Sequence, residues 1–313
     1  MNVSIIGAGS IGVAFAVVFS RANARVRLQD PDENRRQAAL SEITQCLQDL
    51  KAHGLLDEDP LAVAARVEVT ESLEYAVQDA DLVQECAPER MELKQQIFQR
   101  IAAAVPATAV LASSSSALPA STYAPEGPMR ERCLVGHPGN PPYLIPVIEI
   151  VPAPFTSAAC VQRADELYRQ FGLSPVRVRK EVEGFIFNRL QGAVLREAYC
   201  LVRDQVADVE DIDTVMRDGL GLRWSFMGPF ETSDLNTRGG ISSHAIKMGP
   251  AYARMGAERG QKDPWLPELV EKVDGQRRAL LPLDKWADRV RWRDQMLMRL
   301  RRMRRQDKGG AAQ

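Results

Sequence analysis

The sequence predicts an α/β protein in which a doubly wound parallel sheet forms the N-terminal part and an all-α domain forms the C-terminal part. Three observations lead to this fold class. A strand, a glycine-rich turn, a helix and a second strand follow one another within the first thirty residues. Short apolar runs then alternate with helix-like stretches, and purely helical periodicity begins at Phe185. Such alternation is typical of a parallel sheet covered by helices.

The first thirty residues predict a βαβ unit. Residues 3–6 form a β-branched run that predicts a strand, and residues 7–12 contain three glycines and predict a turn. Residues 13–22 are apolar over the length of a helix. Residues 25–30 alternate between polar and apolar side chains, as a second strand does.

The later elements follow from the same patterns. Short apolar runs predict further strands at residues 67–69, 82–86, 110–112, 133–135, 147–151 and 175–178. Helices are expected at residues 91–104, 188–203, 208–218 and 283–305. Because the period changes near Glu183, we expect an α/β domain of residues 1–183 and a helical domain of residues 184–313.

Length and composition indicate a two-domain protein and argue against some classes of partner. The chain has 313 residues, with 40 basic and 41 acidic side chains and 45% hydrophobic residues. A single core stops growing at roughly 250–300 residues, so two domains are expected. The near-zero net charge argues against nucleic acid or an anionic membrane as the main partner. Residues 2–20 carry no charge, but their three glycines favour a strand, turn and helix over a membrane span.

The cysteines indicate a reducing environment. Five are present, an odd number, and none forms a C-x-x-C pair that would hold a metal or run redox exchange. We therefore expect a cytoplasmic protein without a metal site.

The C-terminal segment is rich in arginine. Residues 285–305 contain eight arginines and two aspartates, interleaved with tryptophan, methionine and leucine. One interpretation is a basic arm for nucleic acid or phosphate. The favoured alternative is an amphipathic helix that packs on its own fold, because an apolar stripe with two tryptophans is what a docked helix needs.

The glycine-rich turn predicts a dinucleotide site. Gly7, Gly9 and Gly12 follow a strand and open a helix, and Asp30 closes the next strand. This is the arrangement of a Rossmann-type fold, in which the glycines allow the turn, the approach of a pyrophosphate and close helix packing. A carboxylate at Asp30 would accept hydrogen bonds from the adenine ribose and repel a 2′-phosphate, which favours NAD over NADP. A glycine-rich turn without a ligand is the alternative.

His137 is the histidine that the pattern singles out. The chain has three histidines, and His137 lies where an apolar run ends in the rigid loop Pro138–Pro142, at the edge where open α/β sheets bind ligands. Histidine suits the role of general base in dehydrogenation. Glu149 interrupts an apolar strand and is the nearest downstream acid that could orient it, since a buried carboxylate is costly unless paired. A structural histidine is the alternative.

Five ordered motifs resemble those of the 3-hydroxyacyl-CoA dehydrogenase family. They are GAGSIG at residues 7–12, ECAPE at 85–89, SSSS at 113–116, HPGNP at 137–141 and GFIFNR at 184–189. The likeness runs nearly end to end. Within the family the chain is most similar to the lambda-crystallin and L-gulonate 3-dehydrogenase branch, through the serine run, the His-Pro pair and the segments GLGLRWSFMGP at 219–229 and WRDQMLMRL at 292–300.

The resemblance implies roles for individual residues. His137 would be the base and Glu149 its partner, while Ser116 and Asn188 would hydrogen-bond the reacting oxygen. Glu89 and Lys94 would contact the nicotinamide side of NAD, Ser10 and Ile11 would lie at the pyrophosphate turn, and Asn140 would border the catalytic loop. Because Asn188 begins the first long helix of the second domain, the site is expected between the domains.

Three further positions bear on the substrate. Ser114 replaces an asparagine common in acyl-CoA enzymes, and Gly139 occupies a position that is usually bulkier. Arg223 is either an anchor for a free carboxylate or a surface or interface arginine.

These observations predict NAD-dependent oxidation of a small L-3-hydroxy acid of the L-gulonate type by a homodimer that pairs through its helical domain. Two alternatives are a short-chain 3-hydroxyacyl-CoA dehydrogenase and a crystallin-like structural protein.

Overall fold

The computed structural model describes residues 1–225, 228–235 and 240–260, and the positions 268, 279, 282–285, 288, 291, 292, 295, 296, 298–300 and 302. Contacts divide the chain into two units. The first contains Met1–Arg189 and the described positions after residue 290, and the second contains Leu190–Arg289. This division falls a few residues after the predicted boundary at Glu183 and places the C-terminal segment with the first unit.

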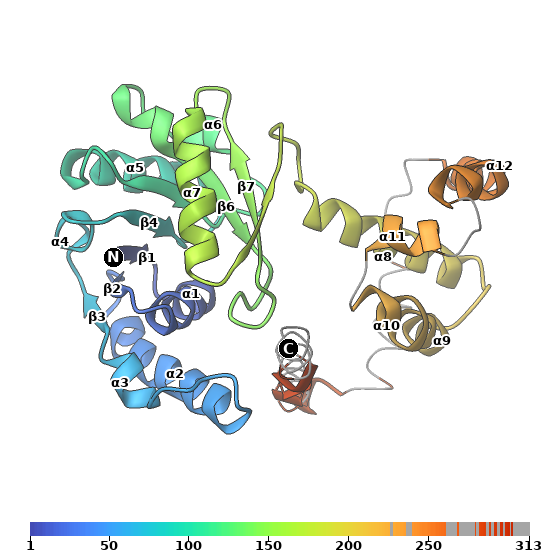
Figure 1. The fold of residues 1–313 in the computed structure, drawn as a ribbon, viewed down its shortest axis with the longest axis horizontal. Coiled ribbons are helices and arrows are strands. Elements are labelled where there is room, and N and C mark those ends of the chain that lie inside the picture. Colours follow the sequence, from blue (N-terminus) through green and yellow to red (C-terminus); the bar gives the residue numbers. More distant parts are fainter. Residues whose placement is uncertain are drawn as a thin grey trace, which may run out of the picture. The chain divides into compact units, whose positions relative to one another are not determined.

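The first unit is built on one eight-stranded sheet with the order β3-β2-β1-β4-β5-β6-β7-β8 (Figure 1). The strands are β1 (Asn2–Ile6), β2 (Arg25–Gln29), β3 (Val67–Thr70), β4 (Leu82–Glu85), β5 (Val110–Ser113), β6 (Cys133–Pro138), β7 (Val147–Pro152) and β8 (Ser174–Arg177). Each corresponds to a predicted strand, and the predicted α/β fold class is confirmed.

One pairing departs from the predicted parallel sheet. Strands β6 and β7 are antiparallel, whereas all other neighbours are parallel. The reason lies in the connection between them, residues 139–146, which is short and contains no helix. A parallel return needs a crossover of about a dozen residues or more, so a short loop forces the chain back antiparallel.

Helices cover both faces of the sheet, which makes it doubly wound. They are α1 (Ser10–Arg21), α2 (Glu33–Ala52), α3 (Pro60–Ala64), α4 (Leu73–Val77), α5 (Met91–Ala104), α6 (Ala120–Tyr123), the 3-10 helix η1 (Pro128–Arg132) and α7 (Ala158–Gln170). Side chains of α1, α2 and α7 form one buried cluster with the strands. Side chains of α4, α5 and α6 form a second cluster with alternate residues of the same strands.

The second unit is helical throughout its described residues, as the sequence predicts. Helix α8 (Phe187–Arg203) leads into it and is followed by α9 (Val209–Thr214), the π-helix η2 (Val215–Leu220), α10 (Gly221–Trp224), α11 (Pro229–Leu235) and α12 (Gly240–Arg259). The predicted helix at 208–218 is therefore split into α9 and part of η2. A small cluster around Val202 and Val209 joins α8 to α9.

About half of the predicted helix at 283–305 lies outside the described residues. Its described part begins with the 3-10 helix η3 (Leu283–Lys285). Met298 is 4% exposed and belongs to the buried cluster of α1, α2 and α7. This position favours the interpretation of a helix docked on its own fold. Among the described residues, no helix has the length and hydropathy needed to cross a membrane.

Candidate active site

The turn between β1 and α1 has the geometry of a pyrophosphate cradle. Gly7 has a φ of +103°, and a Cβ atom there would come within 2.9 Å of the Cys86 backbone. A Cβ on Gly12 would lie 1.9 Å from the carbonyl oxygen of Gly7. At Gly9, by contrast, a Cβ would meet no atom within 4 Å. Gly7 and Gly12 are thus required by packing, whereas the space over Gly9 is open for a ligand.

The N-terminus of α1 completes this cradle. Ser10 and Ile11 form its first turn, and no side chain caps it. Its free backbone N–H groups and the helix dipole favour an anion such as a pyrophosphate. These residues therefore fit the predicted NAD.

Asp30 lies beside the cradle, directly after β2. One of its carboxylate oxygens accepts a hydrogen bond from the backbone N–H of Ala8 at 2.7 Å, and the other accepts one from Asp32 at 2.9 Å. Asp30 is half-buried, so its carboxylate remains accessible at the end of the strand. This is the placement that recognition of the adenine ribose requires.

The antiparallel pairing of β6 and β7 brings His137 opposite Glu149. The two residues are register partners, and Nδ1 of His137 lies 2.7 Å from Oε2 of Glu149. Both side chains are buried. The other oxygen of Glu149 accepts hydrogen bonds from the backbone N–H groups of Ile186 and Phe187, at 2.7 and 2.9 Å, where α8 begins. The carboxylate is therefore fully paired, as a buried charge must be.

This pairing fixes the imidazole tautomer. A carboxylate can only accept hydrogen bonds, so Nδ1 of His137 carries the proton and Nε2 presents its lone pair. The hydroxyl oxygen of Ser116, in the exposed loop after β5, lies 3.1 Å from Nε2. Ser116, His137 and Glu149 thus form one chain of hydrogen bonds. The sequence analysis expected the link between His137 and Glu149 but not the one between Ser116 and His137.

Two aromatic rings that the sequence did not single out flank this chain. The ring centroid of Phe185 lies 5.5 Å from that of His137, and the ring centroid of Phe187 lies 6.4 Å from it, edge-on. Phe185 is buried and has a φ of +48°. Its signal in the sequence is the position directly after Gly184, where the chain turns into α8.

Asn188 lies in the first turn of α8, close to the backbone groups that hold Glu149. It is half-buried, and its Cβ packs near Gly184. By contacts it belongs to the first unit, together with His137. The residues described around the imidazole therefore come from a single unit.

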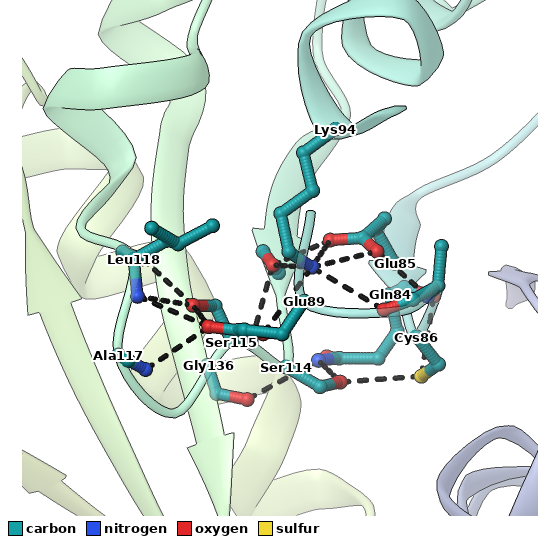
Figure 2. Close-up of polar contacts among 12 residues, drawn as sticks. Gln84, Glu85, Cys86, Glu89, Lys94, Ser114, Ser115, Ala117, Leu118 and Gly136 are labelled. Atoms are coloured by element: carbon teal, nitrogen blue, oxygen red, sulfur yellow. Dashed lines mark hydrogen bonds and ion pairs between the residues drawn. The ribbon is translucent and has the colours of Figure 1, made fainter. Parts of the chain in front are cut away.

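Lys94 and Glu85 form a buried ion pair behind the site (Figure 2). The Nζ atom of Lys94 lies 2.8 and 2.9 Å from the two carboxylate oxygens of Glu85, and both side chains are at most 1% exposed. Glu89 lies 3.8 Å from the same ammonium group. Lys94, which is predicted to contact the cofactor, thus has its ammonium group bound to Glu85 and close to Glu89 inside the protein. The signal for Glu85 was an acid at the end of the apolar strand β4, and the sequence analysis did not use it.

Ser114 belongs to a second polar group beside this pair. Its hydroxyl accepts a hydrogen bond from the amide of Gln84 at 2.8 Å and lies 3.2 Å from the sulfur of Cys86 (Figure 2). Gln84 in turn accepts a hydrogen bond from the buried hydroxyl of Tyr168 at 2.7 Å. The side chain of Ser114 therefore faces the interior of the sheet, and its exchange for asparagine in acyl-CoA enzymes bears on packing there.

The loop after His137 explains why Gly139 stands at a position that is usually bulkier in the family. A Cβ on Gly139 would lie 2.6 Å from Ile145 and 2.9 Å from Val147, so the space of a bulkier residue is already filled by these side chains. Asn140 is exposed and borders a cavity of about 400 Å³ that Ser10 also lines. Asn140 is therefore near the pyrophosphate cradle, as expected for a residue at the edge of the catalytic loop.

Arg223 lies in α10 of the second unit. Its Nε atom is buried and has no hydrogen-bond partner within the described residues. The described residues contain no cluster of three or more side chains that could hold a metal ion.

Comparisons with known proteins cover nearly the whole chain. The model of the 3-hydroxyacyl-CoA dehydrogenase NAD binding domain matches residues 2–182, and that of the C-terminal domain of the same family matches residues 184–279. Lambda-crystallin of Oryctolagus cuniculus is 37% identical over 310 residues, which cover 97% of each chain. L-carnitine dehydrogenase of Pseudomonas syringae pv. syringae (strain B728a) is 39% identical over 276 residues, which cover 86% of this chain and 82% of the relative.

A solved structure agrees with these matches. The NAD⁺-dependent 5-formyl-3-hydroxy-2-methylpyridine 4-carboxylic acid 5-dehydrogenase superimposes with a TM-score of 0.80 at 28% identity, and the match covers 96% of this chain and 97% of the other. The predicted resemblance and the predicted cofactor are both confirmed.

Proposed function

We propose a substrate and a mechanism for this chain, which belongs to the 3-hydroxyacyl-CoA dehydrogenase family and is an NAD-dependent oxidoreductase acting on a CH–OH group. The reaction is oxidation of the 3-hydroxyl of a small, free L-3-hydroxy acid of the L-gulonate type to the 3-keto acid. The observation that carries the mechanism is the hydrogen-bonded chain from Ser116 through His137 to Glu149.

His137 is the general base. Its Nε2 lone pair takes the proton of the 3-hydroxyl, and Glu149 stabilises the imidazolium that results. Ser116 and Asn188 hydrogen-bond the substrate oxygen and orient its C3 hydrogen. Positioning of this kind lowers the barrier by several kcal/mol. NAD, when bound, supplies the hydride acceptor.

The cofactor is held along one edge of the sheet. Gly7, Gly9 and Gly12, with the first-turn residues Ser10 and Ile11, take the pyrophosphate, and Asp30 takes the adenine ribose. Glu89 faces the nicotinamide side. Because Lys94 is buried, it serves that side by holding Glu85 and Glu89 rather than by touching the cofactor.

Two observations support a free acid over a CoA thioester. Arg223, in α10, supplies a guanidinium, which can hold a free carboxylate by two parallel hydrogen bonds. Two similar proteins are named for L-carnitine and for a pyridine 4-carboxylic acid, both of which carry a free carboxylate. A short-chain 3-hydroxyacyl-CoA dehydrogenase is the second candidate, because the family carries that name.

The test is NADH production with L-gulonate, L-3-hydroxybutyrate, L-carnitine and 3-hydroxybutyryl-CoA side by side. We expect the free acids to be oxidised with the higher kcat/KM, and faster turnover of the thioester would reverse the assignment. His137→Gln should abolish turnover while NAD still binds. His53→Gln is the matched control, since His53 is a half-buried residue at the C-terminal end of α2, where its ring contacts the backbone carbonyl of Asp49.

Arg223 can be tested on the same panel. Arg223→Met should raise KM for the free acids about tenfold or more, the loss expected for a charge-assisted hydrogen bond of 1.5–3 kcal/mol. KM for the thioester should stay within twofold. An equal effect on both substrate classes would make Arg223 a structural residue.

The assembly we propose is a homodimer that pairs through the helical unit. This unit exposes large apolar side chains, among them Val215, Leu222, Phe230 and Ile246, each more than 60% exposed. Helices α8, α9 and η2 also line an apolar cavity of about 520 Å³. Light scattering after gel filtration should give a molar mass twice that of the chain. Val215→Asp should lower this molar mass toward that of the monomer. A wild-type monomer at micromolar concentration would refute the proposal.

The surroundings we propose are cytoplasmic, with a small-molecule substrate and neither membrane nor nucleic acid as partner. None of the five cysteines, all of which the structure describes, forms a disulfide, which suits a reducing compartment.

A further inference from the structure

We propose that Glu89 is a positioning residue that holds Ser116 against His137 by tying down the loop of residues 115–118. The inference rests on the proposed function, because Ser116 matters only if His137 is the base. It gives Glu89 a task besides the contact with the cofactor.

The side chain of Glu89 binds the loop on both sides of Ser116. One carboxylate oxygen of Glu89 accepts hydrogen bonds from the hydroxyl of Ser115 and from the backbone N–H groups of Ala117 and Leu118, the latter two at 3.1 Å (Figure 2). The N–H of Leu118 also donates to the hydroxyl of Ser115 at 2.8 Å. A single oxygen thus gathers three donors from a segment of four residues.

Ser116 has no comparable support of its own. It lies in irregular backbone, its side chain is exposed, and its hydroxyl contacts Nε2 of His137. The position of this hydroxyl is therefore set by the neighbours that Glu89 binds. Burial alone would raise the pKa of Glu89, but the hydrogen bonds from Ser115, Leu118 and Ala117 hold it below its ordinary value. Glu89 thus stays ionised at neutral pH, and as a carboxylate it accepts from all three donors.

The loop of residues 115–118 and the side chain of Glu89 are both supported by buried polar contacts of Lys94, Glu85 and Ser113. Lys94, buried against Glu85, attracts the second oxygen of Glu89 from 3.8 Å. The hydroxyl of Ser113 donates to Glu85 and accepts the N–H of Ser115 at 3.2 Å. The ends of β4 and β5 and the start of α5 are therefore joined by fully buried polar contacts. A rigid support of this kind is what holds an exposed catalytic loop in place.

The first arm of the test is spectroscopic and needs no substrate. The chain has three histidines, so the ¹⁵N signals of a histidine-labelled sample can be assigned with the His137→Gln variant. We expect Glu89→Ala to move the Nε2 signal of His137 in the same direction as Ser116→Ala does. Glu92→Ala is the matched control, because it removes an exposed acid from the first turn of α5, three residues after Glu89, and it should leave the signal unchanged.

The second arm is a double-mutant cycle on kcat/KM. Glu89→Ala should lower kcat/KM about ten- to a hundredfold, since misplacing a catalytic group by 1 Å costs on the order of a hundredfold. When kcat/KM for the hydroxy acid is measured at saturating NAD, the same change in the Ser116→Ala background should cost less than threefold, because the group that it positions is already gone. Glu89→Gln, which keeps an acceptor oxygen, should lie between wild type and Glu89→Ala.

The outcomes separate this inference from a role in cofactor binding and from the proposed function. If Glu89→Ala weakens NAD binding and lowers kcat/KM equally in both backgrounds, Glu89 acts on the cofactor alone and the inference fails. It also fails if either Glu89→Ala or Ser116→Ala leaves the ¹⁵N shift of His137 Nε2 unchanged. If no 3-hydroxy acid is turned over, the proposed function fails, and the spectroscopic arm still decides the role of Glu89. Thermal melts of each variant identify any that do not fold.

Discussion

Two glycines of the same turn should respond to the same substitution in opposite ways. In Gly9→Ala the new methyl group enters open space, because no atom lies within 4 Å of it. In Gly12→Ala the methyl group would lie 1.9 Å from the carbonyl oxygen of Gly7 and 3.0 Å from its carbon. Both obstacles are backbone atoms, so no side-chain rotation can relieve the contact.

The structure gives a magnitude for each change. An ordinary contact of at least 3.4 Å at Gly12 requires α1 and the backbone of Gly7 to separate by about 1.5 Å, and overpacking of this kind costs about 3 kcal/mol. For a unit of this size that lowers Tm by roughly 6–12 °C. At Gly9 the reduced entropy of the unfolded chain offsets a less favourable N-cap, so Tm should change by about 2 °C or less. The methyl group would instead occupy the approach of the pyrophosphate and weaken NAD binding about tenfold or more, about 1.4 kcal/mol.

Differential scanning fluorimetry of the free protein and calorimetric titration with NAD measure the two effects separately. We expect Gly12→Ala to lose stability and Gly9→Ala to lose affinity alone. If Gly9→Ala binds NAD as tightly as wild type, the pyrophosphate does not approach Gly9, and the cradle is misassigned. If Gly12→Ala keeps its Tm, the close approach of α1 to the turn does not govern stability.

Three further predictions follow from the structure. Asp30→Ala should lower the ratio of kcat/KM for NAD over NADP about ten- to a hundredfold, and an unchanged ratio would count against its role. Glu149→Gln should reduce kcat by about 10²- to 10⁴-fold, since an amide can donate to His137 and favour the wrong tautomer; a smaller loss in steady-state assays would mean that α8 alone orients the imidazole. Burial raises the pKa of three thiols to about 12 from 9.0, so the free energy of unfolding should be constant below pH 9 and then fall by up to about 1.4 kcal/mol per pH unit for each thiol. Urea titrations at pH 8, 9 and 10 would show this, and a flat profile would contradict the burial of Cys133 and Cys160 and the partial burial of Cys86.

The strands and the cofactor turn could be predicted because their signals are local. Gly7, Gly9 and Gly12 act through the backbone of a single turn, and β-branched runs report directly on buried strands. His137 and Glu149 could be paired because a lone acid in an apolar strand needs a partner, and a lone histidine lay near it in the sequence.

Interactions between distant segments were not visible in the same way. Glu85 and Lys94 look like ordinary surface charges until the end of β4 and the first turns of α5 are brought together. Ser114 was expected to bear on the substrate because it replaces an asparagine common in acyl-CoA enzymes, yet its hydroxyl contacts Gln84 inside the sheet. Which of four adjacent serines points inward depends on how β5 ends, and a run of identical residues carries no pattern that distinguishes them.

The antiparallel return of β7 is the feature on which the site depends. Side chains alternate between the two faces of a strand, so a register error of one residue would turn Glu149 away from His137. The register is set by the connection of residues 139–146, where the N–H of Gly139 donates to the carbonyl of Val147 at 2.9 Å. A side chain at Gly139 would collide with Ile145 and Val147 and push this first pair apart. Glycine at this position therefore serves to align the imidazole of His137 with the carboxylate of Glu149.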